Sequence, residues 1–506
     1  IIIFKTYITG SLVGTRSTVR ISPNYYLKIH YMGSPEQLIM PVAVVMSHPP
    51  PFPVRRSKPE LVAPARATPQ ELKRLSDIDD QESLRWDVPV TLIYRARPSA
   101  AAAARKDPVS VIRRGIAGAL VFYYPLAGRL VEGPNRKLLV NCTGEGVAFV
   151  EAEAEIGLEE LGDAITPPCR QLEDLIYAEA GWRGALTGRP LLSFQVTRFR
   201  CGGFVVGLSY HHTMCDAAGA VQFLNAVAEM ARGSQAPSIP PVWQREAFRA
   251  RRPPVVTCTH LEFSDPKANK NISAGGRWDW TLADAVQSSF FFGPKEIRAL
   301  KSQLTPNQIP CSSSEVVTAC LFRCRVRALG LPPDEPVRVS FAIAVRSLPG
   351  VAVPAGYYGN AFVYPAAVGR AGWVCGEGGG GRPPSLGNAV EVVRKARAQA
   401  SGEYVRSLAD FQAIHGRPAS AVASYIVSDV RVLGFDRVDF GWGEPAFGGV
   451  AAAVSDASIL VRFRNRKGED GIVALIALPP AAVKRFQDEL KTMTRDPAAV
   501  PSYSRL

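Results

Sequence analysis

The stretch His212-Thr213-Met214-Cys215-Asp216 separates a segment that is typical of a β-strand from a segment that is typical of an α-helix. The preceding residues, 203–210, form an apolar run, and residues 217–232 carry apolar side chains at helical spacing. A histidine between a strand end and a helix start is well placed to move protons, because its ordinary pKa lies near working pH. We therefore predict that His212, as a neutral imidazole, takes a proton from an alcohol or amine that attacks an electrophilic carbonyl.

The surroundings of this histidine predict a β-hairpin followed by a helix. Residues 192–200 alternate between apolar and polar side chains, Gly202-Gly203 supplies a turn, and residues 204–210 form the returning strand. His212 therefore lies just beyond a strand end. Gly233 is a plausible stop signal for the helix that follows.

The same stretch also fits a purely structural role. Asp216 directly precedes Ala217 and suits the N-cap of the helix, and His212 could be a core histidine with satisfied hydrogen bonds. Capping and catalysis are compatible. Gly219 removes a side chain from the first turn, so a substrate or a strand could approach the backbone there. We predict a structural role for His211, because strand geometry points it to the opposite face from His212.

A second motif, Asp439-Phe440-Gly441-Trp442-Gly443, lies far downstream, after a strand-like run that includes Ile426, Val430 and Val432. The two motifs together are far more specific than either alone. With both motifs intact and in this order, the chain resembles the BAHD acyltransferases of plants, whose paired signatures are H-x-x-x-D and D-F-G-W-G.

Further landmarks extend the resemblance over about residues 56 to 495. They follow the usual order of the family and comprise Leu75-Ser76-Asp77-Ile78-Asp79, Tyr124-Pro125-Leu126-Ala127-Gly128-Arg129 and Gly356-Tyr357-Tyr358-Gly359-Asn360. The most similar branch is that of the alcohol acyltransferases that include benzyl alcohol O-benzoyltransferase. Three segments indicate this branch: Arg56-Ser57-Lys58-Pro59-Glu60-Leu61-Val62, Ser289-Phe290-Phe291-Phe292-Gly293-Pro294 and Asn465-Arg466-Lys467-Gly468-Glu469-Asp470-Gly471.

The resemblance implies an α/β fold of the chloramphenicol-acetyltransferase type, with two domains, mixed sheets and a channel between the domains. A proline-rich stretch in the middle of the chain agrees with a long crossover linker. We predict an N-terminal extension of uncertain nature at 1–53, a first domain with H-x-x-x-D at 54–235, the linker at 236–262 and a second domain with D-F-G-W-G at 263–506.

The resemblance also implies the chemistry, which is acyl transfer from a CoA thioester to an alcohol, with benzoyl transfer as the nearest guess. His212 is then the general base. Asp216 is a structural support that points away from the substrates and makes an ionic contact. The motif Asp439, Phe440, Gly441, Trp442, Gly443 shapes the second domain, so we do not expect Trp442 to stack on the acceptor. No cofactor is bound, and acyl-CoA is a co-substrate.

The second half of the chain is typical of mixed helix and strand. Ser312 to Glu315 form a capping-box signature at the head of a helix that runs toward Gly330. Ser312 and Ser313 are candidates to bind a phosphate at this helix N-terminus, although capping alone is the better interpretation of Ser312. Strands are expected at 337–345, 459–463 and 472–478, and a loop at 376–384.

Two segments of the second half differ from the family pattern. Val345-Arg346-Ser347-Leu348-Pro349-Gly350 is shorter than usual, and the stretch after Gly449 is abbreviated. A non-catalytic or defective scaffold that binds a ligand is therefore an alternative, as is an amine N-acyltransferase. A covalent mechanism through Cys215 is a further alternative, because its thiol lies three residues from His212.

Composition limits the remaining classes. The chain has 506 residues, 47% of them hydrophobic and 21% charged, as in an ordinary globular protein. The net charge is +14, but the basic residues are scattered and no motif with groove-reading geometry is visible, so we expect no nucleic-acid partner. The phosphates of CoA are a simpler polyanion for this charge.

Nine cysteines occur without a C-x-x-C pair, and there are only six histidines. We expect no metal site and no disulfide framework, and we place the protein in the cytoplasm as a monomer. The apolar run at 38–46 contains Pro41 and is too short to cross a bilayer, so no membrane segment is predicted. Residues 1–50 could be a transit peptide, an erroneous extension of the gene model or a disordered tail.

Overall fold

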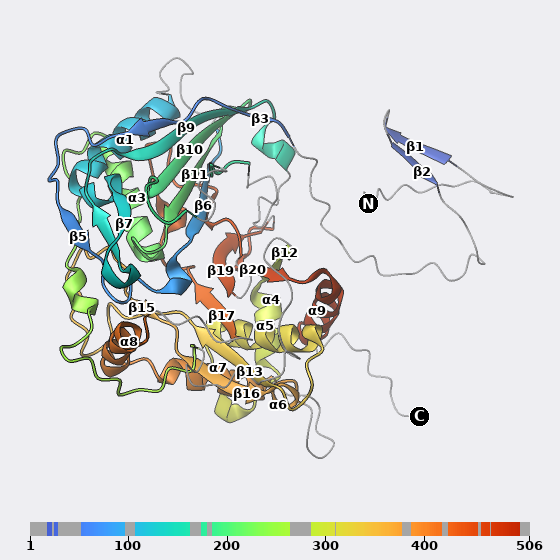
Figure 1. Cartoon of the computed structure of the whole chain (residues 1–506). Coiled ribbons are helices and arrows are strands. Elements are labelled where there is room, and N and C mark those ends of the chain that lie inside the picture. Colours follow the sequence, from blue (N-terminus) through green and yellow to red (C-terminus); the bar gives the residue numbers. More distant parts are fainter. Residues whose placement is uncertain are drawn as a thin grey trace, which may run out of the picture. The chain divides into compact units, whose positions relative to one another are not determined.

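The computed structural model describes most of the chain (Figure 1). The described residues are 18–22, 25–28, 52–96, 107–161, 174–179, 185–263, 285–308, 310–376, 386–416, 424–453, 457–465 and 467–495. The chain divides into two units, Ile1–Pro50 and Pro51–Leu506. In the first unit, β1 (Thr18–Ser22) and β2 (Tyr25–Lys28) form an antiparallel hairpin. The rest of the predicted N-terminal extension lies outside the described residues, apart from its last two positions.

One large mixed sheet has the strand order β18-β6-β11-β10-β9-β3, with β4 also paired to β9. Its strands are β3 (Val54–Arg56), β4 (Glu60–Val62), β6 (Asp87–Tyr94), β9 (Val147–Ala154), β10 (Leu192–Phe199), β11 (Phe204–His211) and β18 (Phe447–Val450). The predicted hairpin is confirmed, since β10 and β11 pair antiparallel from Leu192↔Tyr210 to Arg198↔Phe204. β10 also pairs parallel with β9, so the hairpin lies inside the sheet.

The central strands of this sheet are buried because both of their faces are covered. Helices α1 (Pro108–Phe122) and α3 (Ala217–Ala231) pack against each other beside the sheet (Figure 1). The ring of Phe194 in β10 lies 6.4 Å from that of Phe223 in α3. On β11, a Cβ at Gly207 would collide with the carbonyl oxygen of Leu175. The middle of the β10–β11 hairpin is therefore covered on both faces of the sheet.

A second mixed sheet has the order β12-β20-β19-β17-β13-β16. Its strands are β12 (Val286–Phe292), β13 (Pro336–Phe341), β16 (Ala366–Arg370), β17 (Ser424–Asp429), β19 (Ala457–Arg464) and β20 (Asp470–Leu478). The helices that accompany it are α4 (Pro294–Lys301), α5 (Ser313–Leu329), α6 (Ala371–Val374), α7 (Gly387–Ala398) and α9 (Pro480–Met493). Figure 1 shows α5, α7 and α9 around this sheet, and their apolar faces share a hydrophobic core with its strands.

Smaller elements complete the fold. They are the three-stranded sheet of β5 (Leu72–Arg74), β7 (Arg129–Glu132) and β8 (Leu138–Asn141), the pair β14 (Ile343–Ala344) and β15 (Phe362–Val363), helix α8 (Gly402–His415) and several short 3-10 turns. The predicted linker contains one of these turns, η8 (Arg245–Phe248), which packs against α8. The linker is therefore part of the packed structure and contributes the fully buried Arg245.

Most expected elements of the second half are present. α5 begins after the N-cap Ser312 and ends at Gly330, which has the left-handed conformation. β19 and β20 contain the expected strands at 459–463 and 472–478. The expected strand at 337–345 is divided into β13, which pairs with β16 and β17, and β14, which pairs with β15 in a separate two-stranded sheet. The run through Val430 and Val432 is shorter than expected, since β17 ends at Asp429. The expected loop at 376–384 falls outside the described residues except for Gly376.

The two sheets are joined by a strand exchange. β18, from the C-terminal part of the chain, pairs antiparallel with β6 from Phe447↔Ile93 to Val450↔Val90. The structure is thus an α/β fold with two domains built on mixed sheets, as expected, but one strand of the first sheet comes from the second half of the sequence. The predicted boundaries at 236–262 and 263 stay predictions.

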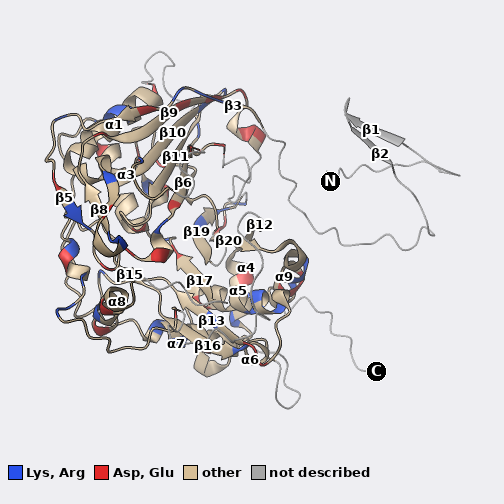
Figure 2. Cartoon of the chain, in the orientation of Figure 1, with Lys and Arg blue, Asp and Glu red and all other residues tan. Residues whose placement is uncertain are grey.

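Charged side chains are distributed over many elements. Figure 2 shows Lys and Arg interspersed with Asp and Glu along the helices and strands, as the scattered sequence pattern indicated. Among the helices of the described residues, none is both long enough and apolar enough to span a lipid bilayer.

Candidate active site

His212 directly follows β11, and its backbone N–H donates to the carbonyl of Trp86 at 2.9 Å. Its imidazole is edge-on to the indole of Trp86, with ring centroids 5.6 Å apart, and lies 5.9 Å from the ring of Phe362. The side chain is only partly exposed. The hairpin, the segment before β6 and β15 thus place one ionisable ring among aromatic side chains.

The electrostatic surroundings favour the neutral form of this ring. Burial lowers the pKa of His212 below its ordinary value, and this effect is opposed by the backbone of His212 itself, by the charge of Asp216, by the side chain of Asn360 and by the backbone of Cys215. A neutral imidazole is the form that accepts a proton, so the site favours a base. Within the described part of the chain, the buried Nδ1 atom has no hydrogen-bond partner of good geometry.

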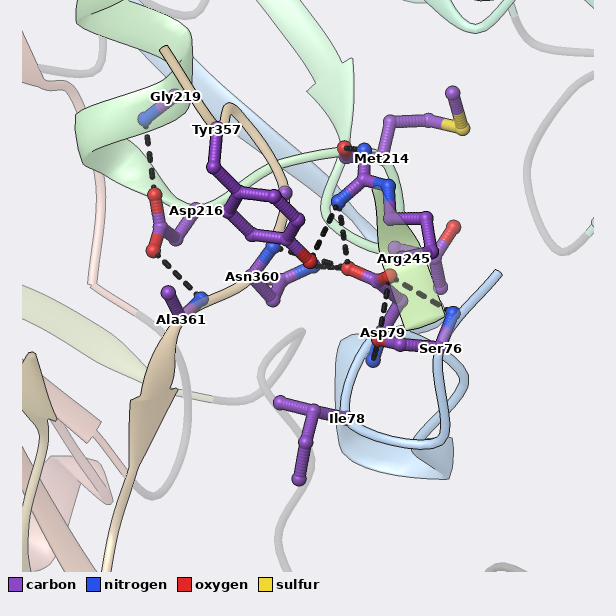
Figure 3. Close-up of polar contacts among 12 residues, drawn as sticks. Ser76, Ile78, Asp79, Met214, Asp216, Gly219, Arg245, Tyr357, Asn360 and Ala361 are labelled. Carbon is purple, nitrogen blue, oxygen red and sulfur yellow. Dashed lines mark hydrogen bonds and ion pairs between the residues drawn. The ribbon is translucent and has the colours of Figure 1, made fainter. Parts of the chain in front are cut away.

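Asp216 is the N-cap of α3, as its position in the sequence predicted. Its Oδ1 accepts the N–H of Gly219 at 2.9 Å, and its Oδ2 accepts the N–H of Ala361 at 3.0 Å (Figure 3). The guanidinium of Arg346 donates to both oxygens, at 2.7 and 2.9 Å. The carboxylate is therefore held by the protein itself and ties α3 to the start of β15.

Arg346 belongs to the segment that departs from the family pattern. It also donates to the carbonyl of Gly359 at 2.9 Å, and the neighbouring Val345 N–H donates to the carbonyl of Ala361. The shortened segment therefore retains the cation that neutralises Asp216.

A second buried network lies beside the H-x-x-x-D stretch. Asp79 is fully buried and accepts hydrogen bonds from the backbone N–H and hydroxyl of Ser76, at 3.0 and 2.6 Å. Arg245 donates to Asp79 at 3.1 Å and to the carbonyl of Met214 at 2.7 Å (Figure 3). The Arg245 guanidinium also lies 4.3 Å from the indole ring of Trp243. This buried cation therefore has a carboxylate, a carbonyl and an aromatic face as partners.

Asn360 connects this network to the catalytic candidate. Its Nδ2 and its backbone N–H both donate to Asp79, at 2.9 and 3.0 Å (Figure 3). The same Nδ2 donates to the carbonyl of His212 at 2.8 Å. The carbonyls of His212 and Met214 are thus both held by side chains from distant parts of the sequence. The backbone that carries His212 has little freedom to move.

Gly219 makes a close contact, but with the chain itself. A Cβ on this residue would collide with the carbonyl oxygen of Tyr358 and would lie 2.9 Å from the Cβ of Cys215. The sequence predicted a close approach to the backbone of Gly219, and the group that approaches it is the segment 356–360 of the chain. Substrate binding at Gly219 stays a prediction, and no contact supports it.

The neighbours of His212 in the sequence are buried. His211 bonds through Nδ1 to the Thr213 hydroxyl at 2.7 Å, and burial together with the Arg189 cation lowers its pKa to about 3. This fits the structural role that its strand position predicts. Cys215 is buried as well, and burial followed by the charge of Asp216 raises the pKa of its thiol far above the ordinary value. Its thiol therefore stays protonated and is a poor nucleophile.

The D-F-G-W-G motif forms a tight turn that packs on the first sheet. The Asp439 Oδ1 accepts the N–H groups of Gly441 and Gly443 at 2.7 and 2.6 Å. The Phe440 ring lies 5.8 Å from Tyr94, and the Trp442 ring lies 5.2 Å from Phe204, both on that sheet. The turn leads into β18. These contacts suit a structural motif, and the absence of stacking between Trp442 and the acceptor stays a prediction.

Ser312 is occupied by capping. Its hydroxyl accepts the N–H of Glu315 at 3.1 Å, and the Glu315 carboxylate in turn accepts from the backbone N–H of Ser312 at 2.8 Å. Ser313 is the first residue of α5. The capping interpretation is confirmed, and phosphate binding by either serine stays a prediction.

Residue-level reasoning missed four charged or polar residues of the site, namely Asp79, Arg245, Arg346 and Asn360. Asp79 and Asn360 lie in segments that stand out only as family landmarks, and Arg346 lies in a segment that stands out for its difference. No feature of the sequence marks Arg245 as part of the site, because a single arginine in a proline-rich linker is typical of a surface residue. Among the described residues, no group of three metal-ligating side chains comes together.

Comparison with known proteins identifies the family to which the chain belongs. The family model described as "Transferase family" matches residues 52–493. The chain belongs to the BAHD acyltransferases. It is accordingly an enzyme that transfers acyl groups.

Several relatives of this BAHD acyltransferase are about half identical to it. Alcohol acyltransferase 16 of Actinidia chinensis var. chinensis is 51% identical over 449 residues, which cover 88% of this chain and 94% of the relative. Benzyl alcohol O-benzoyltransferase of Petunia hybrida is 50% identical over 453 residues, 88% of this chain and 95% of the relative. Alcohol acyl transferase 1 (allele GSa) of Malus domestica is 48% identical over 463 residues, 91% and 96% of the two chains.

Solved structures share the fold of this BAHD acyltransferase at lower identity. Vinorine synthase is 21% identical, with a TM-score of 0.65 over 88% of this chain and 100% of that chain. TRI101 of F. graminearum, in complex with coenzyme A and deoxynivalenol, is 16% identical, with a TM-score of 0.60 over 83% and 97% of the two chains. At these identities the likeness establishes the fold alone.

Proposed function

We propose that this enzyme transfers an acyl group from an acyl-CoA to an alcohol, with His212 as the general base. The observation that carries the proposal is the geometry of His212, a partly exposed imidazole whose backbone is fixed on both sides. Burial lowers its pKa, which favours the neutral form that accepts a proton. Identity of about 50% to alcohol acyltransferases over most of the chain supports the alcohol as acceptor.

The chemistry needs only one proton acceptor, because a thioester is already activated. His212 takes the hydroxyl proton as the alcohol oxygen bonds to the thioester carbonyl carbon, which gives a tetrahedral intermediate with a negative oxygen. When this intermediate collapses, the C–S bond breaks and the imidazolium returns the proton to the CoA thiolate. The products are an ester and free CoA, and no acyl-enzyme is formed.

The aromatic rings around His212 suit an aromatic acyl group or alcohol. Trp86 and Phe362 flank the imidazole, and such faces bind flat apolar groups well. Together with the Petunia hybrida relative, this favours benzoyl-CoA and benzyl alcohol as a first substrate pair. We place the two substrates in a channel between the domains, with CoA as a co-substrate rather than a bound cofactor. Asp216 and Asp439 to Gly443 act as structural supports.

The proposal is tested by release of the free CoA thiol from benzoyl-CoA and acetyl-CoA in the presence of a panel of alcohols and amines. We expect release that depends on an alcohol and falls by about 10²-fold to 10⁴-fold in His212→Ala, the usual size of general-base catalysis. His211→Ala would be a poor control, because that ring is buried. His415→Ala on the solvent-facing end of α8 is a better one, and it should keep full activity.

The other outcomes distinguish the alternatives. Release that survives His212→Ala would refute the role of this residue. Release with amines only would assign an amine N-acyltransferase. A folded protein that binds acyl-CoA but releases no thiol would be the ligand-binding scaffold.

We also propose that the enzyme is a cytoplasmic monomer. No disulfide joins any two of the cysteines that the structure describes, which suits a reducing compartment. Size-exclusion chromatography with light scattering, and the location of a tagged full-length chain in plant cells, test the two parts separately.

A further inference from the structure

Arg245 is a fully buried cation in the predicted linker. It begins η8, and its guanidinium lies 4.3 Å from the ring of Trp243, 5.2 Å from that of Tyr357 and 5.1 Å from that of Tyr358. A Cβ on Gly359 would overlap the Nη1 atom of this guanidinium. The missing side chain of Gly359 therefore leaves room for the cation, and the three aromatic rings hold it in place.

The two ends of the guanidinium have different partners. Nη1 donates to the buried carboxylate of Asp79 at 3.1 Å, and Nη2 donates to the carbonyl of Met214 at 2.7 Å (Figure 3). The ion pair accounts for the burial of the charge, but it does not require the contact with Met214. Met214 lies two residues beyond His212, so the second end of the guanidinium binds the backbone that carries the base.

The contact with Met214 adds to the support of the turn between β11 and α3. At the start of the turn, the His212 carbonyl accepts from the side chain of Asn360 at 2.8 Å. At its end, the Met214 N–H donates to the carbonyl of His211 at 2.9 Å, and the Met214 carbonyl accepts from Arg245. The backbone of the turn is thus held at both ends by side chains from distant parts of the sequence.

We propose that Arg245 is a positioning residue for the general base and acts through the carbonyl of Met214. This inference rests on the proposed function of His212. Proton transfer requires the imidazole to lie within hydrogen-bond reach of the acceptor hydroxyl, and a displacement of about 1 Å can lower the rate by about 10²-fold. The rigid fork of the guanidinium suits this task, because it holds the ion pair and the carbonyl in fixed directions at the same time.

Arg245→Lys separates the two roles of the guanidinium. An ammonium group retains the charge and can pair with Asp79, but it is a point charge on a flexible stem and cannot keep both contacts in their present directions. We expect a folded enzyme in which kcat falls by about 10-fold to 100-fold. KM for the acyl-CoA should change by less than about twofold, because the substitution alters the chemical step and not the binding of the donor.

Gly359→Ala is a second variant, which keeps both Arg245 and its charge. The φ angle of Gly359 is not positive, so an alanine causes no backbone strain there, but its Cβ would displace the Nη1 atom of the guanidinium. We expect kcat to fall with little change in KM, as in Arg245→Lys. If Arg245→Lys does not fold, Gly359→Ala decides, because the buried cation and carboxylate are both still present.

Arg325→Lys is a matched control in the second domain. Arg325 is also buried, donates through Nη1 to the carbonyl of Ala477 at 3.1 Å and lies 5.1 Å from the ring of Tyr425, but it belongs to α5. The substitution removes a similar fork from a similar environment and should lower the melting temperature. We expect kcat of this variant to stay within about twofold of the wild type, because its partners do not carry the base.

A double-mutant cycle with His212→Ala distinguishes positioning of the base from a general loosening of the fold. If Arg245 acts only through His212, Arg245→Lys should lower the rate of the wild type but leave the residual rate of His212→Ala within about twofold. A loss of equal size in both backgrounds would overturn the proposal, as would a fall in kcat of the same size in Arg325→Lys.

The outcomes also separate this inference from the proposed function. Release of the CoA thiol that survives His212→Ala would refute the base, and this inference would fail with it. If His212→Ala loses activity while folded Arg245→Lys or folded Gly359→Ala keeps the wild-type kcat, this inference fails and the proposed function stands. Thermal melting establishes which variants are folded.

Discussion

Arg346 and Asp216 lie 130 residues apart in the chain and form an ion pair with two hydrogen bonds, at 2.7 and 2.9 Å. The pair joins the start of α3 to the segment that follows β14. Since both oxygens of the carboxylate are taken, Asp216 has none left to accept a proton from His212. The pair supports our proposal that Asp216 is a structural support of the site and takes no part in the chemistry.

Arg346→Met should therefore cost stability more than it changes the chemistry. Removing the cation leaves the nearly buried Asp216 carboxylate without its charge partner, and we expect a loss of about 2 kcal/mol or more in the free energy of unfolding. Urea denaturation measures the loss. Arg370→Met removes an ion pair of similar length to Asp334 on the surface and should have a far smaller effect. Equal effects of the two substitutions would contradict this account.

The pH dependence of the enzyme should follow His212. Burial places its pKa below the ordinary value of 6.5, and the base works only when neutral. The acidic limb of kcat/KM should therefore lie below pH 6.5, with full activity retained above it. The folded pKa is lowered, so this group destabilises the folded state as pH falls below the unfolded pKa. An acidic limb above about pH 7 would show that the charge of Asp216 raises the pKa of His212 by more than burial lowers it.

Cys215→Ala should leave acyl transfer within about threefold of the wild type. The buried thiol keeps its proton at neutral pH and cannot attack a thioester. The measurement is the rate of thiol release, with electrospray mass spectrometry of the enzyme during turnover as a second readout. An acyl adduct on the protein would restore the covalent mechanism.

Gly219→Ala should destabilise the fold by about 2 kcal/mol or more, because its Cβ would collide with the Tyr358 backbone, which cannot move away without disturbing Asn360. Gly118→Ala is a suitable control, since that helical Cβ would meet only the flexible side chain of Met230, at 3.2 Å. Thermal melting of both variants distinguishes them. If acceptor KM rose in Gly219→Ala without any loss of stability, Gly219 would have the substrate-binding role that its sequence suggested.

Asp439→Ala should lower the stability of the fold more than Asp439→Asn does. The alanine leaves the N–H groups of Gly441 and Gly443 without an acceptor, for a loss of about 1–2 kcal/mol, whereas asparagine retains an oxygen that can accept both. Neither substitution should change KM for the acceptor alcohol. Differential scanning calorimetry gives the stability of the two variants, and equal destabilisation would show that the charge of Asp439, not its acceptor geometry, matters.

The sequence was sufficient for the local structure around His212. Alternating side chains predict β10, Gly202-Gly203 predicts the turn, and Asp216 before Ala217 predicts the helix cap, because each depends on a few neighbouring residues. The same reasoning was wrong for the end of the strand at 426–432. Val432 has a β-branched side chain, which is typical of a strand, but it is 76% exposed in a turn beyond β17.

The partners of the H-x-x-x-D stretch could not be predicted by such reasoning. Asn360, Arg245 and Asp79 come from three segments that only tertiary folding brings together, and no periodicity links them. The family resemblance pointed to two of these segments but not to their contacts. Arg346 shows the limit most clearly, because its segment departs from the family pattern and yet supplies the cation for Asp216.

The pairing of β18 with β6 has a consequence for synthesis of the protein. Translation proceeds from the N-terminus, so β6 emerges from the ribosome long before Val450 exists to cover its edge. Until then the nascent chain carries an open row of backbone donors and acceptors, a surface on which chains readily aggregate. The first sheet cannot be completed as an isolated N-terminal fragment. Expression of such a fragment on its own should therefore require chaperones, or a supplied peptide that takes the place of Phe447–Val450.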